Sequence, residues 1–520
     1  MNNRLTVWCL IPALLLLSIG LRPAWAGPTD PVTVSLPPDG PGAAFVPGTR
    51  ALANLPGAPY VEEEFFVEGR ATLFNYAHNP PLAPHDIVPV AHDLPYRTRM
   101  IVRRPADPAA FNGTVVVEWW NSTAGFDTAP VFDQSAGYFT RRGVIYVGVT
   151  NSATAIGFLA GGCRLFGTLP PACGTRYATL SLPENGLAYE MMSQIANLLK
   201  SDAPENPLPR AYAVERLFHA GESQQAGSVI TYASAFHLDG VNDGYFIQSL
   251  INARAINSGP RCDDAGAAAF PGCTPRLAYP DTLVRTDLPV PVYQVITQTD
   301  FETLGFNVLG RQDDTRFFRY FEVAGAAHNV VHENVEVLPA GLLGPERLML
   351  EDLCANTMNS TADGPVHGAY VLNALWAQME RHADFRAWYA RVDHPLPKGL
   401  VMDQVDGVLV RDAHGNVTGG VRLPAMDAPT ATYISSNVAS PALPPALAAI
   451  GSLACRLSGS VVPFDRATLE ALYPNHVAYL LSVRQAVDAL QAQGLLLPED
   501  AHAVMREAAG SPVLDSGEDL

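Results

Sequence analysis

The stretch that decides the fold is RLFHAGESQQAGSVITYASAFH, residues 216–237. Its first five residues are mainly apolar and are typical of a short buried strand. The residues after Ser223 are small or compatible with a helix, and Gly221 allows the chain to turn sharply just before it. Ser223 therefore stands at a strand-to-helix turn, where it is either an exposed nucleophile or a serine that only caps the helix.

A nucleophilic serine needs a base that takes its proton and an acid that orients the base. The run VPVYQVIT at 290–297 is strongly β-like, and Asp300 follows it within three residues. An acid placed just after a late strand suits the chain order serine, acid, histidine. We expect Asp300 to be the orienting acid, with Glu302 as the alternative.

The next β-like run, RYFEVAG at 319–325, is followed by His328. The 27 residues between Asp300 and His328 leave room for a helix and two turns before the last strand. We expect His328 to be the general base, and His332 is its local alternative. Ser223, Asp300 and His328 thus make a predicted catalytic triad.

An oxyanion formed at the turn needs backbone N–H donors. Gln224 directly follows the serine, and its N–H is the first expected donor. The second is expected from the loop in EWWNSTAGFD at 118–127, where Trp120 and Asn121 are the candidates. At least one tryptophan of this stretch is expected to lie in the core.

The rest of the chain predicts an α/β fold whose central sheet is mostly parallel and starts antiparallel. Two extended runs come first, and later ones are separated by helical or long connections. Insertions at 153–186 and 251–289 are long enough to be lids or walls of a site. From about residue 336 the pattern becomes helical, and a helical cover over the site is expected. Further strands are expected at 61–76, 96–104, 113–120, 143–152 and 244–250, and a helix at 187–201.

The first 26 residues have the pattern of a secretory leader, with Arg4, an apolar run at 5–21 and Ala-Trp-Ala at 24–26. A signal anchor is the alternative, because the apolar run is near the lower limit for crossing a bilayer. We expect an exported, periplasmic or extracellular protein with no stable membrane span after cleavage. The mature chain, 27–520, is expected to be one domain with a core at about 60–335 and an extension at 336–520.

Charge and cysteine usage narrow the function further. The formal net charge is −18, and loss of the two leader arginines makes it −20, so a nucleic-acid partner is not expected. Six cysteines remain after the leader, and an oxidising compartment favours disulfides. Close spacing suggests two pairs and leaves a third that spans a long separation: Cys163 with Cys173, Cys262 with Cys273, and Cys354 with Cys455. We find no zinc spacing or nucleotide-binding motif, and expect neither a metal nor a cofactor.

Several motifs together resemble a known family, the large and often exported α/β-hydrolase-domain proteins with a G-x-S-Q-S-G-like elbow. Here the elbow reads GESQQAG, and Gln225 and Ala226 depart from the family pattern. The other similar stretches cover the whole mature chain: EEFFVEGRATLFNY, GTVVVEWWNSTAGFD, TQTDFE, AGAAHN and RDAHGNVTGGVRLPAMDAPTATY. The resemblance implies the α/β-hydrolase fold and a serine hydrolase, in particular a carboxylesterase-like ester hydrolase.

The expected substrate is a small-molecule ester, and the aromatic residues of the insertions suggest an apolar or aromatic one. The same triad could also serve an acyltransferase or a peptidase. A non-enzymatic alternative is a protein of hydrolase fold that only binds a partner at the cell surface. The sequence does not predict the oligomeric state.

Overall fold

The computed structural model describes residues 31–38, 42–47, 57, 59–164, 172–305, 308–328, 336–338, 348–349, 351–359, 366, 368–384 and 398–514. The predicted leader and His332 lie outside these residues. Within the described part, no helix is both long and apolar enough to span a membrane.

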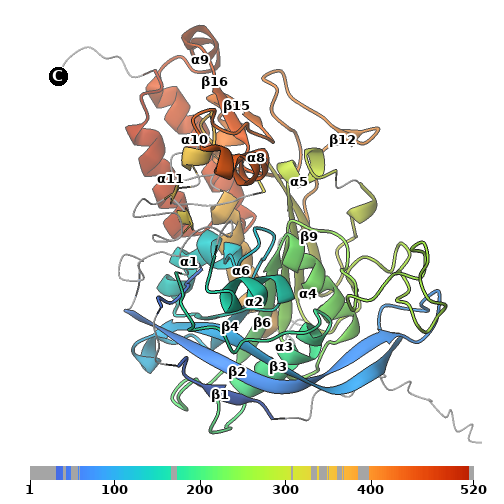
Figure 1. The fold of residues 1–520 in the computed structure, drawn as a ribbon. Helices are drawn as coiled ribbons and strands as arrows, with labels where there is room; N and C mark the ends of the chain where they lie inside the picture. Colours follow the sequence, from blue (N-terminus) through green and yellow to red (C-terminus); the bar gives the residue numbers. More distant parts are fainter. Residues whose placement is uncertain are drawn as a thin grey trace, which may run out of the picture.

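A ten-stranded sheet forms the centre of the described structure, in the order β1-β2-β3-β5-β4-β6-β7-β8-β9-β14 (Figure 1). The pairs β1–β2, β2–β3 and β3–β5 are antiparallel, and all later pairs are parallel. The mostly parallel sheet with an antiparallel start is therefore confirmed. The strands are Thr33–Ser35 (β1), Tyr60–Tyr76 (β2), Ile87–Pro105 (β3), Thr114–Trp119 (β4), Ile145–Val149 (β5), Arg216–Glu222 (β6), Gly244–Gln248 (β7), Val292–Thr297 (β8), Phe318–Ala324 (β9) and Val421–Arg422 (β14).

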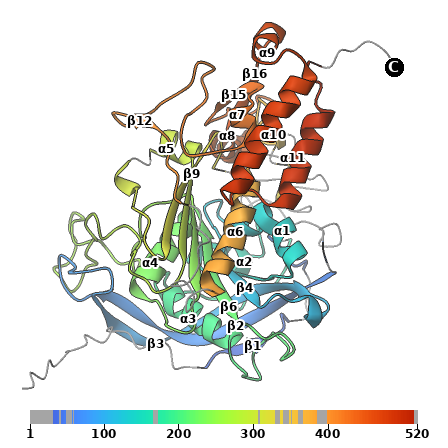
Figure 2. The same ribbon diagram turned by 180° about the vertical axis from the view of Figure 1, so that it is seen from behind.

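Helices cover both faces of the sheet, because its central strands are apolar on both sides. In β4 every residue is buried. Val115 and Val117 pack in the cluster that holds α3 and α4, whereas Val116 packs in the cluster that holds α1 and α6. Figure 2 shows α6 and α1 together on one side of the sheet. The helices of this part are Pro130–Arg142 (α1), Ala153–Ala160 (α2), Leu187–Leu199 (α3), Gln224–Ala235 (α4), Gln298–Glu302 (α5) and Gly368–Asp384 (α6).

The C-terminal extension was expected to be helical, but it also contains strands. Its strand β14 joins the main sheet beside β9, and β15 pairs with β16 in a sheet of their own. The extension forms these strands because its β-prone runs are short and are separated by turns at glycines. Gly419 and Gly420, both with positive φ, make such a turn just before β14. The remaining elements are Gln404–Val405 (β12), Val408–Leu409 (β13), Pro424–Asp427 (α7), Ala431–Ile434 (β15), Ala448–Arg456 (α8), Ser460–Pro463 (β16), Arg466–Leu472 (α9), His476–Ala492 (α10) and Pro498–Gly510 (α11), with the short strands Glu336–Leu338 (β10) and Leu348–Met349 (β11) and 3-10 turns at Pro108–Ala110, Val308–Gly310, Glu351–Leu353 and Pro445–Leu447.

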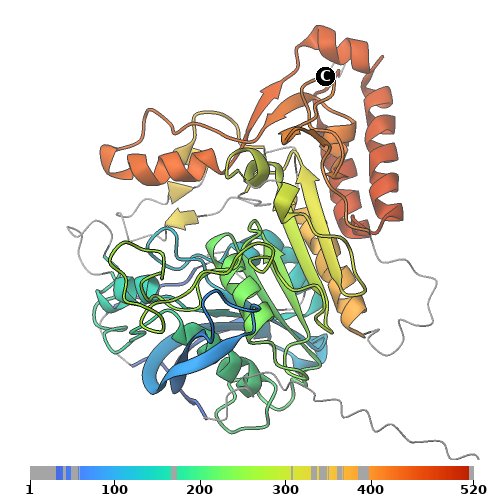
Figure 3. The same cartoon turned by 90° about the vertical axis from the view of Figure 1, so that its right-hand side faces the viewer.

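The extension lies beyond the carboxyl ends of the parallel strands and along one side of the sheet (Figure 3). Two contacts fasten it to the end of β8: Thr299 donates its hydroxyl hydrogen to the carbonyl of Ser435 at 2.6 Å, and Arg411 pairs with Glu302 at 2.6 Å. Ligands of open α/β sheets bind at the carboxyl ends of the strands. The extension therefore borders the region where a site is expected.

The structure contains three disulfides, and each links the cysteines that the spacing suggested. Cys163–Cys173 and Cys262–Cys273 close loops within the two long insertions. Cys354–Cys455 joins two parts of the extension that are 101 residues apart. Cross-links of this kind constrain the unfolded chain and stabilise loop-rich segments.

Candidate active site

Ser223 occupies a sharp turn between β6 and α4. Its φ of 52° and ψ of −120° place a non-glycine residue in a backbone region that costs about 1–3 kcal/mol. Its side chain makes no hydrogen bond to the helix N-terminus, so it is not a capping serine. The Ser223 N–H donates to the carbonyl of Gln248 at 2.8 Å, which anchors the turn on β7. The hydroxyl is thus held at the carboxyl end of β6 without a structural role of its own.

The residues around Ser223 explain how the turn closes. A Cβ atom on Gly221 would lie 2.6 Å from the carbonyl oxygen of Gln225, so only glycine fits there. Gln225 stands where the usual motif has its second glycine, and its side chain is buried within the helix start. The strained conformation of Ser223 is retained despite this larger residue.

Asp300 and His328 form a buried pair at the carboxyl ends of β8 and β9. Asp300 lies on the short helix α5, where its Oδ2 accepts from the backbone N–H of Thr297 at 2.7 Å. Its Oδ1 lies 2.5 Å from His328 Nδ1, and the two residues are 0% and 2% exposed. The rival acid Glu302 instead accepts from Gln298 and pairs with Arg411. The other rival, His332, lies outside the described residues.

Glu222 is a functional candidate that the sequence analysis missed. Its Oε1 lies 2.9 Å from His328 Nε2, on the opposite side of the ring from Asp300. Its Oε2 accepts from the Asn121 side-chain amide at 3.0 Å, and the residue is 4% exposed. The only sequence signal was its place directly before Ser223. Within the described part, no hydrogen bond joins the Ser223 hydroxyl to His328.

The two carboxylates change the protonation of His328. Burial alone lowers the pKa of His328, but the charges of Glu222 and Asp300 outweigh it and raise the pKa to about 10. At neutral pH the ring is therefore an imidazolium that donates to both acids. Because the folded pKa lies above the usual 6.5, this pairing stabilises the fold fully below about pH 6.5, and its contribution is lost as pH rises through about 10.

The expected oxyanion donors differ in whether their N–H groups already have acceptors. Gln224 is the first residue of α4, so its N–H has no acceptor within the helix. The N–H groups of Trp120 and Asn121 are already bonded, to the carbonyls of Val149 at 3.2 Å and Thr128 at 3.1 Å. Neither can turn toward an oxyanion without breaking these bonds.

Ser122, the next residue of the same loop, faces the elbow instead. Its N–H and its hydroxyl both donate to Gln224 Oε1, at 3.2 and 3.1 Å. An oxyanion that displaced the Gln224 amide oxygen would meet these two donors. Trp120 and Trp119 are buried core residues, as expected for at least one of them.

A buried carboxyl group, that of Glu118, holds this loop in place. Glu118 accepts from the backbone N–H groups of Val131 and Phe132, at 2.9 and 3.0 Å, and so caps α1 in place of an N-cap side chain. Burial raises the pKa of Glu118 to about 8. The loop after β4 is thereby tied at its far end to a helix that is rigidly packed on the sheet.

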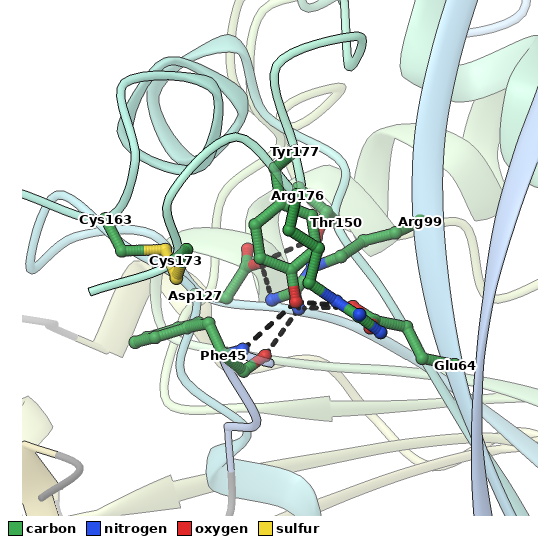
Figure 4. The surroundings of a disulfide bond; sticks show 9 residues. All are labelled: Phe45, Glu64, Arg99, Asp127, Thr150, Cys163, Cys173, Arg176 and Tyr177. Carbon is green, nitrogen blue, oxygen red and sulfur yellow. Dashed lines mark hydrogen bonds and ion pairs between the residues drawn. A yellow bond between two sulfur atoms is a disulfide. The ribbon is translucent and has the colours of Figure 1, made fainter. Parts of the chain in front are cut away.

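A second support is the buried Arg99, whose guanidinium lies between two acids (Figure 4). It pairs with Asp127 at 3.0 Å and with Glu64 at 2.9 Å, and it donates to the Tyr177 hydroxyl at 3.1 Å. Asp127 ends the loop that carries Ser122, and Tyr177 belongs to the first disulfide-closed insertion. Because a broken buried ion pair is costly, this network fixes the loop and the insertion relative to β3.

A cavity of about 140 Å³ adjoins the elbow. Its walls include Ser122, Ser152 and Gln224, which follow β4, β5 and β6, together with Gln225 and Tyr189. Most of its lining is polar, which contrasts with the apolar or aromatic substrate that the sequence suggested. Within the described residues, no group of three or more histidine, cysteine or acidic side chains could hold a metal ion.

The sequence matches the family model described as "Alpha/beta hydrolase domain" over residues 31–506. A comparison with curated proteins gives no match. Among solved structures, a methylesterase is 10% identical with a TM-score of 0.25, over 47% of this chain and 46% of its own. The rice cell wall degrading esterase LipA from Xanthomonas oryzae is 10% identical with a TM-score of 0.20, over 38% and 45%. Esterase 2 of Thermogutta terrifontis is 14% identical with a TM-score of 0.22, over 40% and 70%. The chain thus spans about half the length of the first two structures, and at such scores the likeness carries no argument.

Proposed function

Because this chain belongs to the family of α/β hydrolase domains, we propose that it is an exported serine hydrolase that cleaves carboxylic esters. Ser223 would be the nucleophile, His328 the base and Asp300 the orienting acid. The observation that carries the proposal is the strained, uncapped Ser223 at the end of β6. The buried Asp300–His328 pair is close to this serine, because His328 contacts Glu222, the residue directly before Ser223.

The reaction begins when neutral His328 takes the Ser223 proton and the serine oxygen attacks the ester carbonyl carbon. The Gln224 N–H stabilises the oxyanion, and the Ser122 N–H joins it once the Gln224 side chain moves aside. His328 then gives its proton to the departing alcohol, and an acyl-enzyme remains on Ser223. Water, activated by His328, releases the acid and restores the serine.

Glu222 would regulate the first step, because it holds the Nε2 proton that His328 must lose. The wild-type kcat/KM is expected to rise with pH from neutral toward about 10, as His328 becomes neutral. Glu222→Gln removes one negative charge while keeping a partner for Asn121, and should lower the apparent pKa of the profile by about 1–3 units. The measurement is a pH profile of kcat/KM with a neutral ester.

The matched control is Glu302→Gln, which removes a carboxylate that faces Arg411 and should leave the profile unchanged. A wild-type profile that is flat above pH 6.5, or one that Glu222→Gln does not shift, would contradict this role of Glu222. Such a result would leave the nucleophile itself untouched.

The cellular place of the protein is part of the proposal. The leader pattern at 1–26 and three disulfides suit an oxidising compartment, either the periplasm or the extracellular space. The extension at 336–520 would belong to the same domain, since β14 continues the main sheet and α6 shares the core of α1.

Covalent labelling tests the proposed function directly. A fluorophosphonate should phosphonylate the mature protein on one residue, and peptide mass mapping should locate the adduct on Ser223. His328→Ala should slow labelling strongly, because the serine loses its base. A folded wild-type protein that takes no label would refute the serine-hydrolase assignment and favour a binding role.

A further inference from the structure

The second insertion, 251–289, contributes two arginines to the cavity beside the elbow. Arg254 and Arg261 both line it, opposite the start of α4. The cavity volume, about 140 Å³, is close to that of an apolar cavity of about 150 Å³ that holds benzene in another protein. The cavity can therefore take a group the size of one small ring or a short acid.

The two arginines face the cavity without a carboxylate partner among the described residues. The guanidinium of Arg254 makes no hydrogen bond or ion pair there, and its stem lies against Gly227, where a Cβ would come 2.7 Å from Arg254 Cγ. Among the described residues, the Arg261 side chain donates only to the backbone carbonyl of Asn257, at 2.9 Å. In a chain with 33 basic and 51 acidic residues, two such arginines at one cavity indicate a place for an anion.

Two acids of the surrounding loops accept from backbone N–H groups. Glu184 accepts from the backbone N–H groups of Gly186 and Ser258 with its two oxygens. Asp264 accepts from the backbone N–H of Arg261 at 2.8 Å and lies 3.4 Å from Arg276. Within the described residues neither acid forms an ion pair with Arg254 or Arg261, although the charge of Asp264 favours the charged form of Arg261, so guanidinium N–H donors stay available to a ligand.

The field of both guanidinium groups reaches the interior of the cavity. Burial raises the pKa of the lining residue Tyr189 to about 12, while Arg254 and Arg261 act against this rise by favouring the phenolate. Burial and the repulsion of Arg276 lower the pKa of Arg261, which an incoming anion would reverse.

Gln225, which lines the cavity, carries an acceptor that is not used. Gln225 Oε1 is buried and has no hydrogen-bond partner among the described residues. A buried acceptor without a partner is unfavourable, and a ligand hydroxyl would satisfy it once the Gln225 amide turns from its buried position into the cavity. Gln224 and Gln225, the two residues after Ser223, line the cavity, so it lies beside the turn that carries the proposed nucleophile.

From these contacts we infer that the cavity binds a carboxylate carried by the ester substrate, with Arg254 and Arg261 as its cations. Gln225 Oε1 accepts from a hydroxyl of the same substrate. This inference rests on the proposed ester hydrolysis and names its substrate class: polar esters of acidic, hydroxylated compounds rather than apolar ones.

The test compares two pairs of esters that differ only in a carboxylate. On the acyl side the pair is p-nitrophenyl hemiglutarate and p-nitrophenyl glutaramate, and on the alcohol side the acetyl esters of para-hydroxybenzoate and para-hydroxybenzamide. One carboxylate member should have a kcat/KM about ten- to a hundredfold above its amide, as charge-assisted hydrogen bonds provide. The preference should arise mainly in KM and fall with added salt.

The double variant Arg254→Gln, Arg261→Gln should abolish the preference. Arg285→Gln is the matched control from the same insertion, because its guanidinium is engaged by Asp287 with two contacts of 2.9 Å. Equal rates within both wild-type pairs, or a preference that survives in the double variant, would overturn the inference. Fluorophosphonate labelling of Ser223 and hydrolysis of neutral p-nitrophenyl acetate report separately whether the proposed hydrolase activity holds.

Discussion

Ser223→Ala is expected to lower kcat/KM for a neutral ester by about 10⁴- to 10⁶-fold, since the acyl-enzyme can no longer form. The oxyanion donors and the cavity remain, so a small residual rate over water is expected. The measurement is initial rates with p-nitrophenyl acetate, on protein whose thermal unfolding has been recorded. Ser201→Ala, an exposed serine on the same protein, is the control and should keep its activity.

The conformation of Ser223 makes this prediction more specific. Because φ is 52° at a non-glycine residue, Ser223→Gly should remove the same activity while raising the free energy of unfolding by about 1 kcal/mol. Loss of activity together with a gain in stability is expected if Ser223 is a nucleophile whose strained backbone destabilises the fold. A serine with a structural role would instead lose stability when it is replaced. Full activity of either variant would exclude Ser223 as the nucleophile.

Asp300→Asn should lower kcat by about 10³- to 10⁴-fold, because the amide can hold the wrong tautomer of His328 and does not stabilise the imidazolium. Glu302→Gln is the matched variant two residues away on the same short helix, and its activity should stay within about twofold of the wild type. Steady-state kinetics on both proteins, with circular dichroism as a folding check, make the comparison.

The contact of Glu222 with His328 affects how the Asp300→Asn kinetics are interpreted. In Asp300→Asn the remaining carboxylate of Glu222 still contacts His328 Nε2, but the ring loses the acid that orients it through Nδ1. The loss of rate should therefore persist when the pH is raised. Inactivation by Glu302→Gln with an active Asp300→Asn would reverse the assignment of the acid.

Local patterns in the sequence were enough for most strands of the main sheet and for the order of the triad candidates. The apolar run before Ser223, and the β-like runs before Asp300 and His328, place three residues at the ends of parallel strands, which meet at one edge of a sheet. The same local logic did not find that the extension adds the strand β14 to the main sheet. β14 has only two residues, and its pairing with β9 comes from a partner about 100 positions away in the chain.

Side-chain partners were decided by the tertiary structure alone. The sequence by itself determined the α/β class, the strand-to-helix turn at Ser223 and the cysteine spacing, because turns and periodicity depend on neighbours along the chain. Only the tertiary structure set Glu222 on His328 Nε2, bonded the amides of Trp120 and Asn121 to carbonyls, and brought Arg254 to the cavity. Hydrogen bonds and ion pairs form between residues far apart in sequence, so which groups meet depends on how the strands and loops pack.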